Sequence, residues 1–69
     1  MAQVLTINDY QTALESAVKT MVMTPHEASY RMDARIGRQW KEGKISFQSA
    51  VEESKYCRQR FFEAAVGYI

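Results

Sequence analysis

Apolar side chains recur at intervals of three and four residues in three segments of the chain. In the segment 8–22 they mark one helical face, and polar residues take the other face: Tyr10, Ala13, Leu14, Ala17, Val18 and Met21. This spacing is typical of an amphipathic helix with one buried face. Asn8 is a suitable N-cap for this helix, and Thr6 followed by Asp9 is an alternative start.

The motif TPHE at residues 24–27 predicts the start of a second helix. A Thr N-cap, a Pro at the first helical position and a Glu that closes the capping box favour a helix over residues 25–41. The Pro also disfavours helical geometry in the residue before it, so the first helix must end near Met23. Gly43 supplies a C-terminal cap for the second helix, whereas Gly37 is a weak point within it.

Ser46 is a suitable N-cap for a third helix that extends to about residue 66. Small and apolar residues follow one another in steps of three and four, as in a heptad seam: Phe47, Ala50, Ser54, Cys57, Phe61, Ala64 and Tyr68. The short connection 42–45 makes the second helix the first candidate partner, in an antiparallel hairpin. The sequence thus predicts a single all-α domain over residues 1–69, with helices at about 8–22, 25–41 and 46–66 and a flexible segment 1–6.

The size of the chain suggests that it needs a partner. A chain of 69 residues hides only roughly 60% of the surface that it exposes when unfolded. A single cysteine and a single histidine form neither an intrachain disulfide nor a zinc site made by the protein alone. We therefore expect an oligomer, most simply a homodimer, with no metal and no cofactor.

The composition is that of a soluble globular domain, with 46% hydrophobic and 25% charged residues. The first residues, MAQVL, lack the pattern of a signal peptide, and no run of apolar residues is long enough to span a membrane. These observations predict a cytoplasmic protein in which Cys57 is a free thiol.

Charge is unevenly distributed along the chain, although the net charge is only +1 and the pI is near 7.9. Residues 1–30 carry one base and three acids, a net charge of −2, whereas residues 31–60 carry eight bases and four acids, a net charge of +4. Three arginines at i, i+4 and i+7 share one face of the second helix. Because Arg, Tyr and Trp are enriched at protein interfaces, the predicted partner-binding residues are Tyr30, Arg31, Arg35, Arg38, Trp40 and Lys41.

This arginine stripe (Arg31, Arg35 and Arg38) has three interpretations. It can be solvated or paired within the chain, it can bind an acidic protein, or it can bind phosphates of a nucleic acid. The solvated or paired interpretation ranks first, and the pI, well below the value of about 9 that is typical of nucleic-acid-binding domains, favours a protein over a nucleic acid as the partner. A helix-turn-helix is disfavoured, since the third helix begins with FQSAVEE, apolar and acidic where phosphate would approach.

The segment 60–69, RFFEAAVGYI, is more apolar than a single helix contact requires. One set of its residues continues the seam toward the second helix, and Phe62, Val66 and Ile69 form a neighbouring strip at i, i+4 and i+7. Either the first helix or a second copy of the chain covers that strip. The predicted self-association residues are Phe61, Phe62, Val66, Tyr68 and Ile69.

The sequence offers few groups for catalysis. His26 lies in the capping turn of the second helix, and Cys57 lies on the apolar seam, where thiols are usually inert. Glu52 and Glu53 point to different sides of a helix, and no phosphate loop, zinc spacing or nucleotide fingerprint occurs.

The sequence therefore predicts a non-enzymatic protein–protein interaction module. It would act, as a homodimer, as a small regulator, inhibitor or adaptor that occludes a site on a larger protein. One alternative is a small DNA- or RNA-binding regulator that uses the arginine stripe. A second alternative is a structural subunit of a larger assembly.

Overall fold

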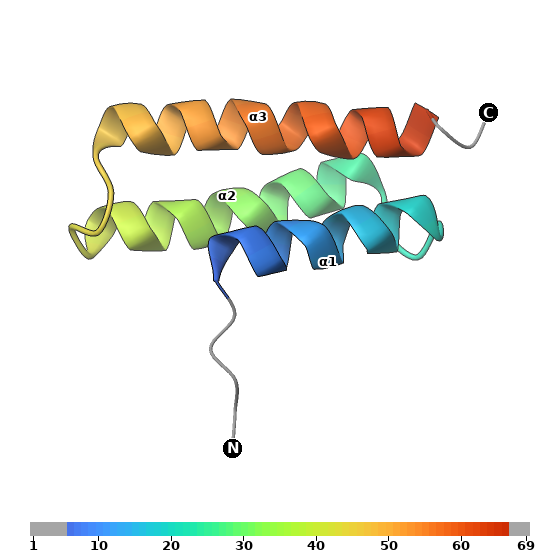
Figure 1. Ribbon diagram of the computed structural model, residues 1–69, viewed down its shortest axis with the longest axis horizontal. Coiled ribbons are helices and arrows are strands. Elements are labelled where there is room, and N and C mark those ends of the chain that lie inside the picture. Colours follow the sequence, from blue (N-terminus) through green and yellow to red (C-terminus); the bar gives the residue numbers. More distant parts are fainter. Residues whose placement is uncertain (1–5, 67–69) are drawn as a thin grey trace, which may run out of the picture.

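The computed structural model describes residues 6–66, which form three helices and contain no strand (Figure 1). The helices are α1 (Ile7–Lys19), α2 (Pro25–Lys41) and α3 (Phe47–Val66). The prediction of an all-α chain with three helices is confirmed, and α2 has the predicted bounds. The third helix begins at Phe47, directly after the predicted N-cap Ser46.

A hydroxyl side chain caps the N-terminus of each helix. The side-chain oxygens of Thr6, Thr24 and Ser46 each accept the backbone N–H three residues further on, at 3.0, 3.1 and 3.1 Å. For the first helix, Thr6 is the N-cap in place of Asn8, so Ile7 joins the helix and packs against the core. Residues 1–5 of the predicted flexible segment lie outside the described residues.

Helix α1 ends three residues earlier than predicted, because Met21 adopts a left-handed conformation with φ 63°. The N–H groups of Met21 and Val22 donate to the carbonyls of Val18 and Ala17, at 3.1 and 3.0 Å. This pattern is a Schellman motif. Gly43, with φ 75°, closes α2 in the same way, as predicted. The apolar spacing could not reveal the earlier end, since Met21 continues that spacing beyond the last helical residue.

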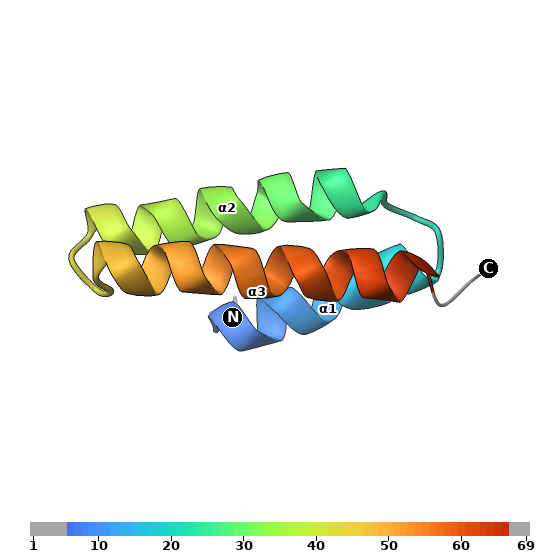
Figure 2. The same cartoon turned by 90° about the horizontal axis from the view of Figure 1, so that it is seen from above.

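The core lies where the three helices meet. Its buried apolar members among the described residues are Leu14, Val18, Ala28, Met32, Ile36, Cys57, Phe61 and Ala64. The most extensive of the helix contacts joins α2 to α3. Figures 1 and 2 show α3 alongside α2 for much of its length, with α1 placed against both. The predicted seam of α3 supplies the core in the second half of that helix and is more exposed near its start.

Several side-chain contacts fix the helices relative to one another. In order from the 42–46 turn outward, those between α2 and α3 are Trp40 with Phe47, Asp33 with Ser54 and Arg58, and His26 with Phe62. On one side of this pair, α1 is attached by Arg60, which donates to Glu15 at 2.9 Å. The other side of the α2–α3 pair, facing away from α1, is covered by no helix of the described part of the chain (Figure 2).

Candidate functional site

Two of the three side chains in the arginine stripe are engaged within the chain. Arg31 pairs with Glu27 at 3.0 Å, one turn earlier on α2. The guanidinium of Arg35 lies 4.5 Å from the ring centroid of Tyr10 on α1, a cation–π contact. Within residues 6–66, Arg38 is exposed and forms no ion pair. The stripe therefore lies on the flank of α2 that faces α1.

The remaining members of the predicted partner-binding set lie elsewhere on α2. Trp40 follows Arg38 by two positions, about 200° around the helix, and its ring packs against Phe47 of α3 at 5.4 Å. Tyr30 and Lys41 are exposed and lie seven positions before and four positions after Gly37, so these three residues share one face. The structure thus divides the predicted set into the arginine stripe on one flank and Tyr30, Trp40 and Lys41 on the other.

An open groove runs between α2 and α3 on the side away from α1, with a volume of about 320 Å³. The residues that line this α2–α3 groove are Asp33, Ile36, Gly37, Ala50, Val51, Ser54 and Lys55. Trp40 and Phe47, 44% and 63% exposed, lie together toward the turn end of α2 and α3. At the opposite end, Phe62 is 38% exposed and meets the ring of His26 edge-on at 5.1 Å.

The charged residues among those that line the groove are Asp33 and Lys55. Among the described lining residues, Asp33 is the one carboxylate, and it already accepts hydrogen bonds from Ser54 and from Arg58, the latter at 3.2 Å. Lys55 lines the groove and Lys41 lies one helical turn beyond Gly37, and neither forms an ion pair within residues 6–66. A negative charge entering the groove would therefore meet the Lys55 ammonium group, which forms no ion pair within residues 6–66.

Sequence reasoning missed the outward residues of α3 because it placed Phe47 on the internal seam. Phe47 lies at the start of α3, beside the last turn of α2, and its side chain is 63% exposed. Gly37 was the available signal: a glycine in the middle of an amphipathic helix indicates either close approach of another chain or open space.

The predicted self-association residues are also divided. Phe61 is fully buried in the core of its own chain, whereas Phe62 is partly exposed and Val66 is 64% exposed. Tyr68 and Ile69 lie outside the described residues. Only Phe62 and Val66 of the described members thus have surface that a second chain could reach.

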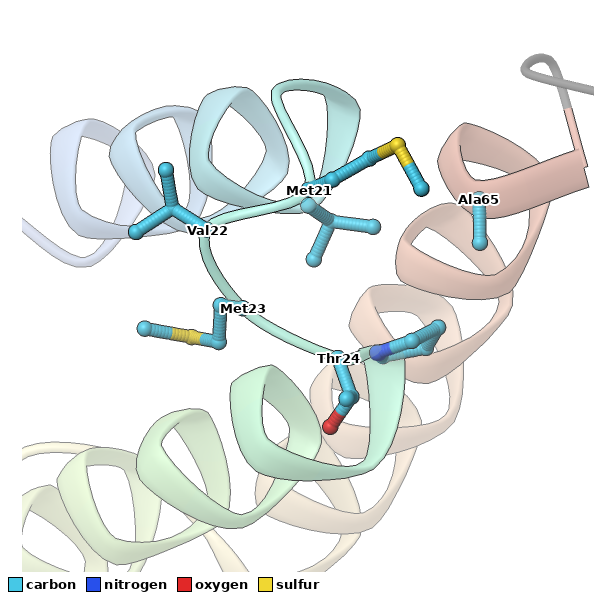
Figure 3. A pocket seen from close by; sticks show the side chains of 7 residues that line it. Met21, Val22, Met23, Thr24 and Ala65 are labelled. Atoms are coloured by element: carbon cyan, nitrogen blue, oxygen red, sulfur yellow. The ribbon is translucent and has the colours of Figure 1, made fainter.

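A second apolar region lies at the α1–α2 turn, beside the end of α3 (Figure 3). It surrounds a pocket of about 260 Å³ lined by Val18, Met21, Val22, Met23, Thr24, Pro25 and Ala65. Met21 extends from the turn toward Ala65 in Figure 3. Met21 and Val22 are 78% and 79% exposed, and none of the lining residues is charged. We call this region, together with Val66, the apolar end.

The one cysteine of the chain, Cys57, is buried in the core. Burial, followed in effect by the carboxylates of Glu53, Glu15 and Asp33, raises the pKa of the Cys57 thiol from 9.0 to about 11. A thiol of this kind is a poor nucleophile at neutral pH. Within residues 6–66, no three His, Cys, Asp or Glu side chains come together as a metal site.

Comparison of the chain with protein-family models, curated proteins and solved structures gives no match. None of the helices within residues 6–66 has the length and apolar character needed to cross a membrane. The exposed groove and the apolar end are therefore the features from which a function is inferred.

Proposed function

We propose that this chain is a non-enzymatic protein–protein interaction module, a small regulator, inhibitor or adaptor that covers a site on a larger protein. The observation that carries this proposal is the α2–α3 groove, with exposed Trp40 and Phe47 at one end and Phe62 at the other. Aromatic side chains that are half-exposed on a free surface and become buried in a complex are the usual anchors of protein interfaces.

The platform of this surface is an antiparallel α2–α3 hairpin. Three contacts support it: Trp40 meets Phe47 next to the turn, Asp33 meets Ser54 near the middle, and His26 meets Phe62 at the far end. Each step toward the start of α2 is matched by a step toward the end of α3, as antiparallel packing requires. Such a hairpin holds side chains of two helices in fixed register along one groove.

A protein partner fits this surface better than a nucleic acid does. Arg31 is paired with Glu27 and Arg35 is stacked on Tyr10, which leaves Arg38 as the member of the stripe that is available to phosphate. A nucleic-acid interface that neutralises several phosphates weakens steeply as salt rises. An aromatic-anchored protein contact should weaken only mildly between low and moderate salt, so a salt titration of the complex separates the two functions.

Site-specific cross-linking tests the proposal. A photoreactive phenylalanine in place of Phe47 should cross-link a defined protein in a lysate of the source cells. The same group in place of Ala13 should not, since Ala13 is exposed on α1, although the apolar spacing places it on the buried face. The captured protein is then purified, and its binding to the wild-type chain and to Val51→Glu is measured. Equal capture from both positions, or equal binding by both chains, would contradict the groove as the docking surface.

We also propose that the chain self-associates through the apolar end. Met21, Val22 and Val66 present exposed apolar side chains around an uncharged pocket, so two copies can meet there without repulsion between like charges. In sedimentation velocity, wild-type chain should form a dimer that Val22→Glu and Val66→Glu abolish and Val51→Glu leaves intact. A monomer at all concentrations, or a dimer lost only in Val51→Glu, would refute self-association at this end.

A further inference from the structure

Gly37 stands at a position where the packing of the chain itself does not require glycine. A Cβ atom added there would meet no other heavy atom within 4 Å, and α2 continues for four residues beyond it. Glycine within a helix is destabilising relative to alanine. The space above Gly37 opens into the α2–α3 groove, whose other wall is formed by Ala50, Val51 and Ser54. The absent side chain therefore widens a surface groove and relieves no internal crowding.

The shape of the groove fits a helix. It lies between two helices, and its described lining spans residues 33–37 of α2 and 50–55 of α3, between one and two helical turns of each. The small residues Gly37 and Ala50 allow a helix backbone to come close, and Val51 offers an apolar contact. On the other side of the hairpin, α1 already packs against both α2 and α3. A helix bound in the groove would pack against α2 and α3 on the side opposite to α1.

The charge of the groove favours an acidic helix and disfavours a second copy. Lys55 lines the groove, Lys41 lies one helical turn beyond Gly37, and Asp33 is already paired with Arg58. Two copies that met groove to groove would bring these ammonium groups toward each other, and like charges across an interface are unfavourable. Glutamate side chains at the edges of a docked helix would instead lie near both lysines.

We infer that the α2–α3 groove binds an acidic amphipathic helix of a partner protein, with the apolar face of that helix over Gly37 and Val51 and its acids beside Lys41 and Lys55. This inference depends on the proposed interaction function and specifies the partner. Binding of this kind uses apolar anchors at i, i+3, i+4 and i+7 of the docked helix.

The experiment uses three synthetic peptides of about 17 residues, as long as α2. The first has leucines at i, i+3, i+4 and i+7 and glutamates on the opposite face; the second has lysines in place of glutamates; the third is a scrambled version of the first. Trp40 is the single tryptophan of the chain and its fluorescence reports on the groove. The acidic peptide should shift Trp40 emission to the blue with a Kd of about 1–100 µM, and the other two should bind at least tenfold more weakly.

Matched pairs of variants test whether the peptide binds in the α2–α3 groove. Gly37→Leu fills the groove and should weaken binding at least tenfold, whereas Ala13→Leu adds the same side chain at an exposed position of α1 and should have no effect. Lys55→Glu should weaken binding about five- to tenfold, and Arg38→Glu, on the flank facing α1, less than about twofold. Gly37→Ala serves as the folding control and should melt at or above the wild-type temperature.

Several results would overturn the inference. Equal binding of the acidic and lysine peptides, or no binding by any peptide at about 0.3 mM, excludes an acidic helix as the occupant. Loss of binding in Arg38→Glu but not in Lys55→Glu moves the site to the arginine stripe. A dimer that Gly37→Leu abolishes makes a second copy the occupant. If cross-linking from position 47 still identifies a partner while the peptides fail, the interaction function stands and only the acidic helix is wrong.

Discussion

At the scale of single residues, Met21 and Gly43 occupy equivalent positions at the ends of two helices. Both have positive φ, 63° and 75°, and both close a Schellman motif. Only glycine adopts this conformation without a steric cost, because a Cβ atom approaches the following carbonyl. The α1–α2 turn therefore keeps a strained methionine whose side chain is mostly in solvent, which fits a role for Met21 at the apolar end.

Replacing Met21 with glycine should stabilise the chain. Met21→Gly removes the steric cost of the left-handed conformation and should raise the free energy of unfolding by about 0.5–1 kcal/mol, measured by urea unfolding and circular dichroism. Gly43→Ala is the matched control and should lower it by about 1 kcal/mol. A loss of stability in Met21→Gly would mean that contacts of the Met21 side chain with the end of α3 outweigh the backbone strain.

Gly37 is expected to be replaceable as far as folding is concerned. Gly37→Ala should raise the free energy of unfolding by about 0.5–1 kcal/mol, because alanine favours the helix and its Cβ meets nothing within 4 Å. For a domain of this size the melting temperature should rise by roughly 2–8 °C in thermal unfolding. A decrease would show that the α2–α3 groove is narrower in solution than in the structure.

The Cys57 thiol should be almost unreactive in the folded chain. With a pKa raised to about 11, its thiolate fraction at pH 8 is about 100-fold lower than that of an ordinary thiol, and burial blocks access as well. Alkylation by iodoacetamide should therefore be at least about 100-fold slower in the folded chain than in urea. Equal rates in the two conditions would contradict the buried position of Cys57.

The same shift of the Cys57 pKa makes stability depend on alkaline pH. The unfolded thiol loses its proton near pH 9.0 and the folded one near pH 11, so the unfolded state is favoured progressively between these values. The stability that the protonated Cys57 thiol gives the folded state is complete below about pH 9 and is lost as the pH rises toward 11. The urea concentration at the midpoint of unfolding should fall more steeply over this pH range for the wild type than for Cys57→Ala. If the two midpoints fall in parallel, groups other than Cys57 cause the decrease.

At the scale of secondary-structure elements, Asp33 is the polar connection between α2 and α3. Its carboxylate accepts hydrogen bonds from Ser54 and Arg58 of α3. Asp33→Ala should lower the free energy of unfolding by about 1–2 kcal/mol, since it removes both acceptors and leaves the partly buried Ser54 hydroxyl without its partner. Urea unfolding measures the loss.

Two controls separate this connection from ordinary surface pairing. Arg31→Ala breaks an exposed ion pair within α2 and should cost less than about 0.5 kcal/mol. Arg58→Ala should cost less than Asp33→Ala, because Ser54 still donates to the carboxylate. Equal costs for Asp33→Ala and Arg31→Ala would mean that the α2–α3 contact is held by apolar packing alone.

The helices were predictable from the sequence because their signals are local. Thr24 and Ser46 are caps whose hydrogen bonds span only three residues, and Gly43 ends a helix through its own backbone. The groove was not predictable, because it depends on which flank of α2 meets α1. The stacking of Arg35 on Tyr10 settles that choice, and these residues are far apart in the sequence. For the same reason the sequence predicts that the three arginines share one face of α2, but it does not predict that the fold separates them from Trp40.

At the scale of the whole molecule, a small core is combined with two apolar surfaces of different charge. The described part of the chain buries eight apolar residues, two of which are alanines, so the free energy of unfolding of one chain is small. The lining of the α2–α3 groove contains Asp33, which is paired with Arg58, and Lys55, whereas the pocket of the apolar end has no charged lining residue. This difference favours a different partner for each surface, with a second copy at the apolar end.

Self-association at the apolar end would make stability depend on chain concentration. A dimer interface stabilises the folded chains by mass action, by up to about 2.7 kcal/mol when the chain rises to about 100 times the Kd. The melting temperature of the wild type should therefore increase by several degrees over such a range in calorimetry. That of Val22→Glu should stay constant, because Val22 is 79% exposed and its replacement removes the interface without touching the core. A constant wild-type melting temperature would show that the core of a single chain is sufficient, and the exposed Met21 and Val22 would then need a partner other than a second copy.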